Sequence, residues 1–446
     1  MEVQVLSNET IKPSSPTPDH LRHYKLSFLD QISPRIYSPI IYYYAMNDLG
    51  DETNYVAGIS EKLKKSLSQA LTLYYPLAGR FSDVGDSLQC DDEGVPYKEA
   101  RVIKTKLDDV LKDPVPLELN KLLPFELDEV AELPLGVQLN VFACGGLAVG
   151  VCVSHRLGDA LSVLVFIRTW MAIARREDID ALPRPEFNSA DLFRPQDTKG
   201  YDPSLAAVKK NMCATNVTKR FALATDKIEA LRAKCEERTS QSGENPRRVS
   251  RIEAVSAFIW TRFAAAAKLA ESEPPEKTYA IIHPVNIRPK LDPPLPQYSF
   301  GNYYTPSAKL GPVSSTSEEQ YCYGLAREIG EALRRVDKGF VEYIRDRGDE
   351  FFEFVKKETD RFLKGEVVGL SFSSLCRFPL YEADFGFGKP AWVSSAARGF
   401  ECSVGFMDNK AGDGIEAYIC LSLQDMDRLE ADKEFLAFVS PNIGPK

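Results

Sequence analysis

Apolar residues recur at spacings of three and four in the N-terminal part of the chain. Between residues 56 and 75 these positions are Ile59, Leu63, Leu67, Leu71 and Tyr74. Residues with this spacing fall on one face of an α-helix, and the following Pro76 cannot continue a helix. The pattern therefore predicts an amphipathic helix that ends before Pro76.

A different pattern follows further along the chain. Residues 137–142 alternate well enough for a strand, and residues 147–153 form a mostly apolar run of strand length, with a Gly-Gly pair between them. Asp159 then stands where a helix N-cap is expected, before apolar residues at helical spacing as far as Met171. The segment is predicted to form a strand, a turn, a second strand and a helix.

Helical and strand patterns alternate again beyond residue 217. Strands are expected at 219–223, 278–286, 392–395, 401–407 and 415–421. Helices are expected at 225–235, from the Ser250/Glu253 capping box to residue 269, near 317–336 and near 339–364. Because both halves mix helices with strands, the chain is predicted to be α/β (α+β) rather than all-α or all-β.

Between residues 181 and 217 the periodicity fades, and prolines and small polar residues dominate. A chain of 446 residues exceeds one ordinary hydrophobic core. We therefore predict an N-terminal domain over 1–180, a crossover linker over 181–217 and a C-terminal domain over 218–446. Part of the segment 366–390 can pack with the N-terminal domain.

Charge and composition narrow the class of partner. The chain has 55 Lys and Arg against 64 Asp and Glu, a net charge of −9. An acidic balance argues against a nucleic-acid-binding protein, which needs a basic face, but it leaves room for a local basic pocket. The partners expected are small molecules, without nucleic acid or membrane.

The compartment is inferred from what the sequence lacks. It has no basic and apolar leader and no apolar run near the ~18 residues of a membrane helix. Its nine cysteines are odd in number and contain no Cys-x-x-Cys pair. Reduced thiols in a cytoplasmic protein explain this better than disulfides or a zinc site. A monomer is expected because two domains can bury the core without a partner.

One of the four histidines stands at a position suited to chemistry. His155 follows the second predicted strand and precedes the predicted helix, in the order Ser-His-Arg-Leu-Gly-Asp. An imidazole can accept a proton from a hydroxyl near neutral pH, and Asp159 lies one helical turn later. The spacing is short enough to arise by chance, so these residues alone also allow a core histidine beside a helix cap. Of the others, His20 and His23 are expected at the surface and His283 in the core.

A second candidate is the loop Asp384-Phe-Gly-Phe-Gly-Lys-Pro390. It matches neither a phosphate-binding P-loop nor a dinucleotide fingerprint, and a loop of this kind taken by itself is more often a structural turn. No cluster of His, Cys and carboxylates has the spacing of a metal site, and no Gly-x-Ser-x-Gly motif of a serine hydrolase is present.

Taken together and in this order, the motifs resemble those of the plant BAHD acyltransferases, nearly from end to end. The Pro-rich lead-in at residues 11–18 most resembles the branch that contains alkaloid acetyltransferases. The matching motifs are Tyr75–Arg80, Cys144–Gly146 with His155–Asp159, Asn286–Arg288 with Gly301–Asn302, and Asp384–Pro390.

The resemblance implies a two-domain, chloramphenicol-acetyltransferase-like fold with a solvent channel between the domains. It implies that His155 is a general base, which deprotonates an acceptor hydroxyl for direct attack on an acyl-CoA thioester. Acyl-CoA, most often acetyl-CoA in this branch, is then a co-substrate, and neither a permanent cofactor nor a metal is expected. Asp159 is implied to orient the loop of His155 by pairing with Arg288.

The same resemblance assigns Asp384, which is often named as catalytic in the family, a mainly structural role together with Gly386 and Gly388. The chain departs from the family at Phe387 and Leu375, where Trp is usual. The region of Ser373 and Leu375 is expected to belong to the acceptor pocket and oxyanion region. Because Leu has no N–H to donate, we hypothesise that Leu375 instead enlarges the acceptor pocket.

The function implied is O-acetylation of a hydroxyl on an alkaloid or terpenoid metabolite. The alternatives are a benzoyl, hydroxycinnamoyl or N-acyltransferase of the same family, and a catalytically impaired relative that binds CoA or a metabolite.

Overall fold

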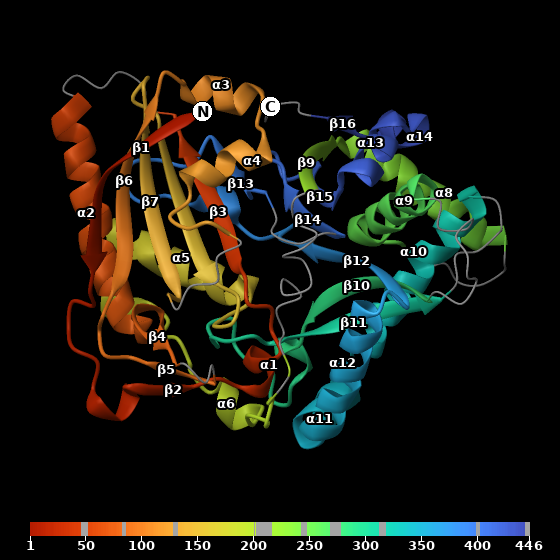
Figure 1. Cartoon of the computed structure of the whole chain (residues 1–446), viewed down its shortest axis with the longest axis horizontal. Helices are drawn as coiled ribbons and strands as arrows, with labels where there is room; N and C mark the ends of the chain where they lie inside the picture. The colour runs from red at the N-terminus through yellow and green to blue at the C-terminus, as the bar shows by residue number, and fades with distance from the viewer. Residues whose placement is uncertain are drawn as a thin grey trace.

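The structure is a computed structural model that describes residues 1–45, 52–82, 86–127, 133–199, 201, 216–241, 248–267, 278–311, 318–397 and 402–441. Two β-sheets stand next to each other, and helices pack on both (Figure 1). Strands from the N-terminal half form most of one sheet, and strands from the C-terminal half form the other. This mixed architecture is the fold class that the sequence predicts.

The first sheet has six strands in the order β1-β6-β7-β8-β3-β13, all antiparallel to their neighbours except β6 and β7. The two central strands confirm the strands predicted at 137–142 and 147–153, and every residue of β8 is buried. The strands are β1 (Glu2–Ile11), β3 (Tyr37–Tyr44), β6 (Val95–Ile103), β7 (Leu135–Phe142), β8 (Leu147–Ser154) and β13 (Trp392–Ser394).

Helices cover both faces of this sheet. On one face lie α2 (Glu52–Leu73) and α5 (Ala160–Ala174), and on the other α3 (Leu107–Lys112) and α4 (Pro116–Leu119). Leu63, Leu67 and Leu71 of α2 are fully buried, which confirms the amphipathic helix predicted before Pro76. The apolar pattern of α2 therefore fixes this helix against the sheet.

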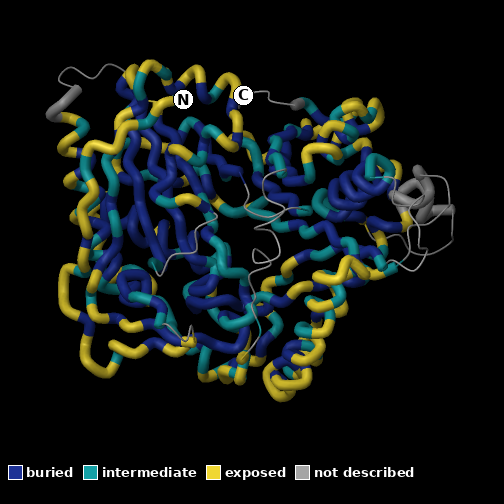
Figure 2. Tube along the Cα trace, in the orientation of Figure 1, coloured by how far each residue is buried: buried dark blue, intermediate teal, exposed yellow. Residues whose placement is uncertain are grey.

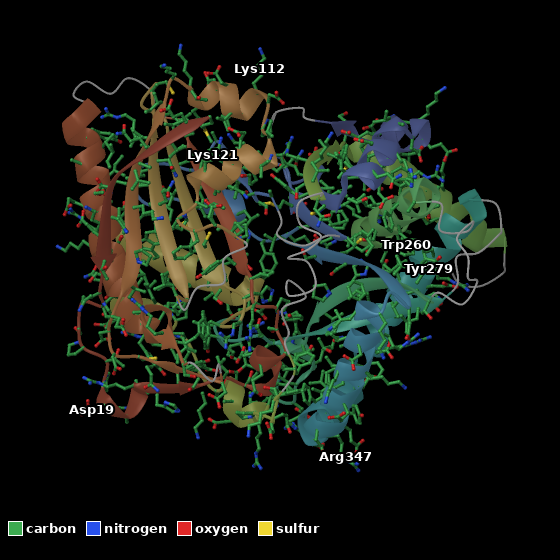
Figure 3. The ribbon with its side chains drawn as sticks, in the orientation of Figure 1. Asp19, Lys112, Lys121, Trp260, Tyr279 and Arg347 are labelled. Atoms are coloured by element: carbon green, nitrogen blue, oxygen red, sulfur yellow. The ribbon has the colours of Figure 1, made fainter. Side chains whose placement is uncertain are left out.

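The second sheet has seven strands in the order β11-β10-β12-β14-β15-β9-β16. They are β9 (Asn216–Leu223), β10 (Thr278–Asn286), β11 (Tyr304–Gly311), β12 (Val367–Ser374), β14 (Ser403–Asp408), β15 (Ile415–Ser422) and β16 (Ser440–Pro441). The apolar helix α9 (Arg251–Ala266) packs on it, and the ring of Trp260 lies 6.3 Å from that of Tyr279 in β10 (Figure 3).

Further helices surround these two layers, and a small sheet β2-β5-β4 completes the N-terminal half. Their bounds are α1 (Phe28–Gln31), α6 (Ser189–Leu192), α8 (Thr225–Gln241), α10 (Glu318–Arg335), α13 (Leu423–Ala431), α14 (Lys433–Phe438), β2 (His23–Lys25), β4 (Arg80–Phe81) and β5 (Ser87–Gln89).

The single helix predicted near 339–364 is wrong. The segment forms two helices, α11 (Lys338–Asp346) and α12 (Gly348–Leu363), which meet at Arg347 (Figure 3). The backbone of Arg347 leaves the helical region, with φ −126° and ψ 43°. Acidic residues in the first turn of α12 suit a new helix N-terminus, whereas the charged pattern of the sequence continues across the break.

One C-terminal segment lies within the N-terminal sheet. β13 pairs with β3 along Trp392–Ser394, and the indole of Trp392 stacks on Tyr43 at 4.9 Å. The indole N–H of Trp392 also donates to Glu416 of β15, 3.2 Å away, and Glu416 forms a buried ion pair with Arg220 of β9. A fully buried indole thus connects the two sheets.

The domain boundaries at 180 and 218 stay a prediction, and residues 202–215 of the linker lie outside the described residues.

Burial follows this two-sheet arrangement, because the interior strands of both sheets are buried and the exposed residues lie on the outer helices and turns (Figure 2). Over the residues that the structure describes, no helix is both long and apolar enough to cross a membrane.

Candidate active site

His155 stands in the turn between β8 and α5, at the end of a buried strand. Its backbone N–H donates to the carbonyl of Ile36, 2.9 Å away, and its own carbonyl accepts from the Nδ2 of Asn302 at 2.8 Å. Its ring is half-buried and meets the ring of Tyr304 edge-on, at 5.6 Å between centroids. Contacts from two distant parts of the chain therefore fix the backbone and the ring of this residue.

Asp159 caps α5, and its carboxylate is held by a buried guanidinium. The Nη1 and Nη2 of Arg288 lie 2.7 Å and 3.0 Å from the two carboxylate oxygens. The backbone N–H groups of Ser162 and Tyr303 donate to the same carboxylate, at 3.0 Å and 3.1 Å. The structure thus joins Asp159 and Arg288 in the bidentate pair that the resemblance implies.

The guanidinium of Arg288 serves as the centre of a wider network. It comes from the short 3₁₀-helix Arg288–Lys290 after β10, and only 2% of the residue is exposed. It also donates to the carbonyls of Ser299 and Gly301 and to the hydroxyl of Ser162. Arg288, which follows strand β10 of the second sheet, therefore holds the loop between His155 and α5, which follows strand β8 of the first sheet.

Sequence reasoning missed a second buried carboxylate near this loop, that of Asp30. Its Oδ1 accepts from both the backbone N–H and the Nδ2 of Asn302, at 2.9 Å and 2.8 Å. Its Oδ2 accepts from the backbone and hydroxyl of Ser27 and from Ser189. Burial raises the pKa of the Asp30 carboxyl above its usual range. The local signal was the Ser27-x-x-Asp30 capping box of α1, which by itself predicts only a helix start.

Asp384 organises its own loop. Its Oδ1 accepts from the backbone N–H groups of Gly386 and Gly388, at 2.6 Å and 3.0 Å. Both glycines have positive φ, 87° and 104°, which favours glycine at these positions. The loop is tied to the N-terminal half by Lys62, which donates to the carbonyl of Gly386, and by Arg175, which donates to the carbonyl of Asp384. These contacts fit a structural role.

The aromatic residues of this loop point into the N-terminal core. Phe385 is fully buried against Trp170, at 4.7 Å between centroids. Phe387 meets the ring of Tyr44 at 4.8 Å, and the hydroxyl of Tyr44 donates to the carbonyl of Ala383. Phe387 thus places an aromatic ring against Tyr44 at the position where the family usually has Trp.

Ser373 and Leu375 lie at the end of β12 and just beyond it. Both are half-buried. The backbone N–H of Leu375 donates to the carbonyl of Phe406, and the Leu375 side chain packs against the N-terminal core. Their place in an acceptor pocket stays a prediction.

A cavity of about 620 Å³ lies between α5 and the Asp384 loop. Its charged lining residues are Arg168, Arg175, Lys389, Glu177, Glu382 and Asp384. Arg175 pairs with Glu177 and Lys389 with Glu382, so most of these charges are compensated. Within the described ranges, no three His, Cys, Asp or Glu residues come together in a way that could hold a metal ion.

Comparison with known proteins defines the class. A model of the Transferase family matches residues 1–436. The limonoid 21-O-acetyltransferase of Melia azedarach is 36% identical over 448 residues, 99% of each chain. The stemmadenine O-acetyltransferase of Catharanthus roseus is 34% identical over 438 residues, 97% of each chain. The crystal structure of vinorine synthase superimposes with a TM-score of 0.81 at 30% identity, over 99% of this chain and 100% of that one.

The chain therefore belongs to the Transferase family, that of the plant BAHD acyltransferases. It is an acyltransferase that uses acyl-CoA as co-substrate without a permanent cofactor. Its relatives include plant O-acetyltransferases of alkaloid and terpenoid metabolites.

Proposed function

We propose that this enzyme transfers an acetyl group from acetyl-CoA to a hydroxyl group of an alkaloid or terpenoid metabolite, with His155 as the general base. The observation that carries the proposal is the half-buried imidazole of His155. Backbone hydrogen bonds and the Tyr304 ring fix it at the junction of β8 and α5. The likeness to O-acetyltransferases of both metabolite classes supports the choice of acceptor.

In the proposed reaction, the imidazole of His155 takes the proton of the acceptor hydroxyl as the oxygen attacks the thioester carbonyl carbon. The carbon–oxygen bond forms and a tetrahedral oxyanion results. When the oxyanion collapses, the carbon–sulfur bond breaks, and the proton on the imidazolium passes to the leaving CoA thiolate. The step needs no covalent enzyme intermediate if the two substrates are held in position.

The pair of Asp159 and Arg288 supports His155 indirectly. Four donors already occupy the carboxylate of Asp159, so it is poorly placed to relay a proton. Its proposed role is to fix the loop between His155 and α5 through a charge-assisted pair. Asp384 is proposed to shape the loop that contains Gly386 and Gly388 rather than to react.

The test is a screen of acyl-CoA donors against polycyclic alcohols by mass spectrometry, with the parent enzyme and with His155→Ala. We expect acetyl transfer by the parent enzyme and a loss of about 10²–10⁴-fold in the variant. His20→Ala, which changes an exposed histidine, is the matched control and should retain activity.

Each contrary result has its own meaning. Unchanged transfer by His155→Ala would remove the general base. A preference for benzoyl-CoA or hydroxycinnamoyl-CoA, or for amine acceptors, would replace the proposed donor or acceptor. No transfer by the parent enzyme would favour an impaired relative.

We also propose that the protein is a cytoplasmic monomer. The seven described cysteines are all free thiols, which supports a reducing compartment. Light scattering after gel filtration tests the monomeric state.

A further inference from the structure

The segment of residues 27–36 reaches His155 by three routes. Ile36 accepts from the backbone N–H of His155. The hydroxyl of Ser33 lies 3.3 Å from that of Tyr304, whose ring meets the imidazole. Asp30 reaches it through Asn302. This segment lies far from the His-x-x-x-Asp motif in sequence, and the motif itself gives no reason to expect it at the site.

Asn302 forms the bridge between Asp30 and His155. Its amide nitrogen Nδ2 lies 2.8 Å from the Oδ1 of Asp30 and 2.8 Å from the carbonyl oxygen of His155. An amide NH₂ has two hydrogens, so each contact uses one of them. The backbone N–H of Asn302 also donates to Asp30. The carboxylate thereby sets the orientation of the amide, and the amide holds the backbone of His155.

The hydrogen bonds of Asp30 favour its ionised form and so act against burial, which raises the pKa of this carboxyl. Each of its five partner groups can donate, and two of its donors are backbone N–H groups that cannot accept. The residue is fully buried. In the part of the chain that the structure describes, Asp30 forms no ion pair. A buried charge without a counter-ion acts over a longer range than a paired one.

The other charges around His155 differ from Asp30. Asp159 is neutralised by Arg288. Burial raises the pKa of the phenols of Tyr24, Tyr303 and Tyr304, and the charge of Asp30 adds to the effect, so these phenols stay neutral.

Two arginines remain near His155. Arg156 directs its guanidinium over the ring of Phe81, at 4.1 Å. Arg35 lies one residue before Ile36 and is half-buried. Its positive charge would oppose the effect of Asp30 on an imidazolium.

We propose that Asp30 is the positioning residue of the active site, which holds His155 through Asn302 and stabilises its protonated form with an unpaired negative charge. The proposal rests on His155 being the general base. An imidazolium forms each time that base accepts a proton, so a buried anion joined to His155 through Asn302 favours that state. Asp30 would then have the electrostatic function that the motif's own Asp159 cannot have while it is paired with Arg288.

The test is Asp30→Asn in the full-length enzyme, with Asp425→Asn as the matched control. Asp425 occupies the same position in the first turn of α13, three residues after the N-cap Ser422, and the hydroxyl of Ser422 donates to it, so both variants remove a carboxylate that accepts from the N-cap serine. We expect Asp30→Asn to lower kcat by about 10-fold or more and to move the acid limb of the pH–rate profile down by about 0.5–1 pH unit. Asp425→Asn should move neither.

A second readout follows His155 directly. The chain has only four histidines, so an NMR titration of ¹³C-labelled His can be assigned by comparison with His155→Gln. The midpoint of the His155 signal should fall in Asp30→Asn and should stay in place in Asp425→Asn. An unchanged midpoint and pH profile in a folded, active Asp30→Asn variant would overturn the proposal.

If Asp30→Asn fails to fold, Asn302→Ala replaces it, because this variant removes the amide that holds the carbonyl of His155 and leaves the charge of Asp30 in place. A loss of kcat of about 10-fold with an acid limb that stays in place is expected, and an unchanged kcat would overturn the proposal. An inactive parent enzyme would count against the proposed function instead, so the two failures can be distinguished.

Discussion

Removal of the guanidinium at position 288 should destabilise the enzyme far more than removal of an exposed one. Arg288→Met preserves much of the side-chain length but deletes the guanidinium N–H groups that now donate to Asp159, Ser299 and Gly301. Asp159 is only 7% exposed, and its carboxylate would keep only the N–H groups of Ser162 and Tyr303. The variant therefore contains an uncompensated buried charge.

Loss of one partner of a buried ion pair costs about 3–5 kcal/mol of folding free energy. The double variant Asp159→Asn/Arg288→Met removes both charges, so its cost should be smaller than the sum of the two single losses, by about 2 kcal/mol or more. The measurement is the urea midpoint followed by intrinsic fluorescence. Arg347→Met, which breaks an exposed pair with Glu350, is the control and should leave the midpoint unchanged.

Two results would refute this reasoning. One is an Arg288→Met midpoint no lower than that of Arg347→Met. The other is a double variant whose loss equals the sum of the single losses, which would mean that the pair is not coupled.

Two other predictions concern pH and the acceptor pocket. The ring of His283 stacks on Phe372 and forms a hydrogen bond with the hydroxyl of Ser256. Burial lowers the pKa of this imidazole to about 4. The unfolded residue takes up a proton near pH 6.5, whereas the buried ring stays neutral down to about pH 4. The free energy of unfolding should therefore fall by up to about 3 kcal/mol as the pH falls from 6.5 to 4. The urea midpoint of His283→Phe should fall less over this range, whereas equal slopes would contradict the assignment. Leu375→Trp should reduce transfer to bulky acceptors more than to small ones in the mass-spectrometric screen, and an equal loss on both would refute the hypothesis that Leu375 enlarges the pocket.

Local pattern was enough to predict the elements around His155. The periodicity of α2, the two strands β7 and β8 and the cap at Asp159 all depend on residues close in sequence. The ordered motifs added the pairing of Asp159 with Arg288, because a family resemblance contains long-range information that periodicity lacks. The channel between the domains and the roles of Ser373 and Leu375 remain predictions.

Asp30 could not be predicted because its function depends on a contact across 272 positions. Its neighbours in sequence show only a capping box, and many such boxes simply start a helix. The break at Arg347 was missed for a related reason, since the charged pattern that predicts a helix continues from α11 into α12. Periodicity reports which face is buried, but it does not report where the backbone changes direction.

The position of β13 has a consequence for anyone who divides or recombines this chain. A fragment that ended in the linker would leave β3 with an open edge where Trp392–Ser394 now pairs, and an unpaired edge strand invites association with other chains. A chimera that exchanged the C-terminal half for that of a relative would bring in a foreign edge strand, together with a foreign indole against Tyr43. Modular engineering of this enzyme therefore has to move residues 380–394 with the N-terminal half.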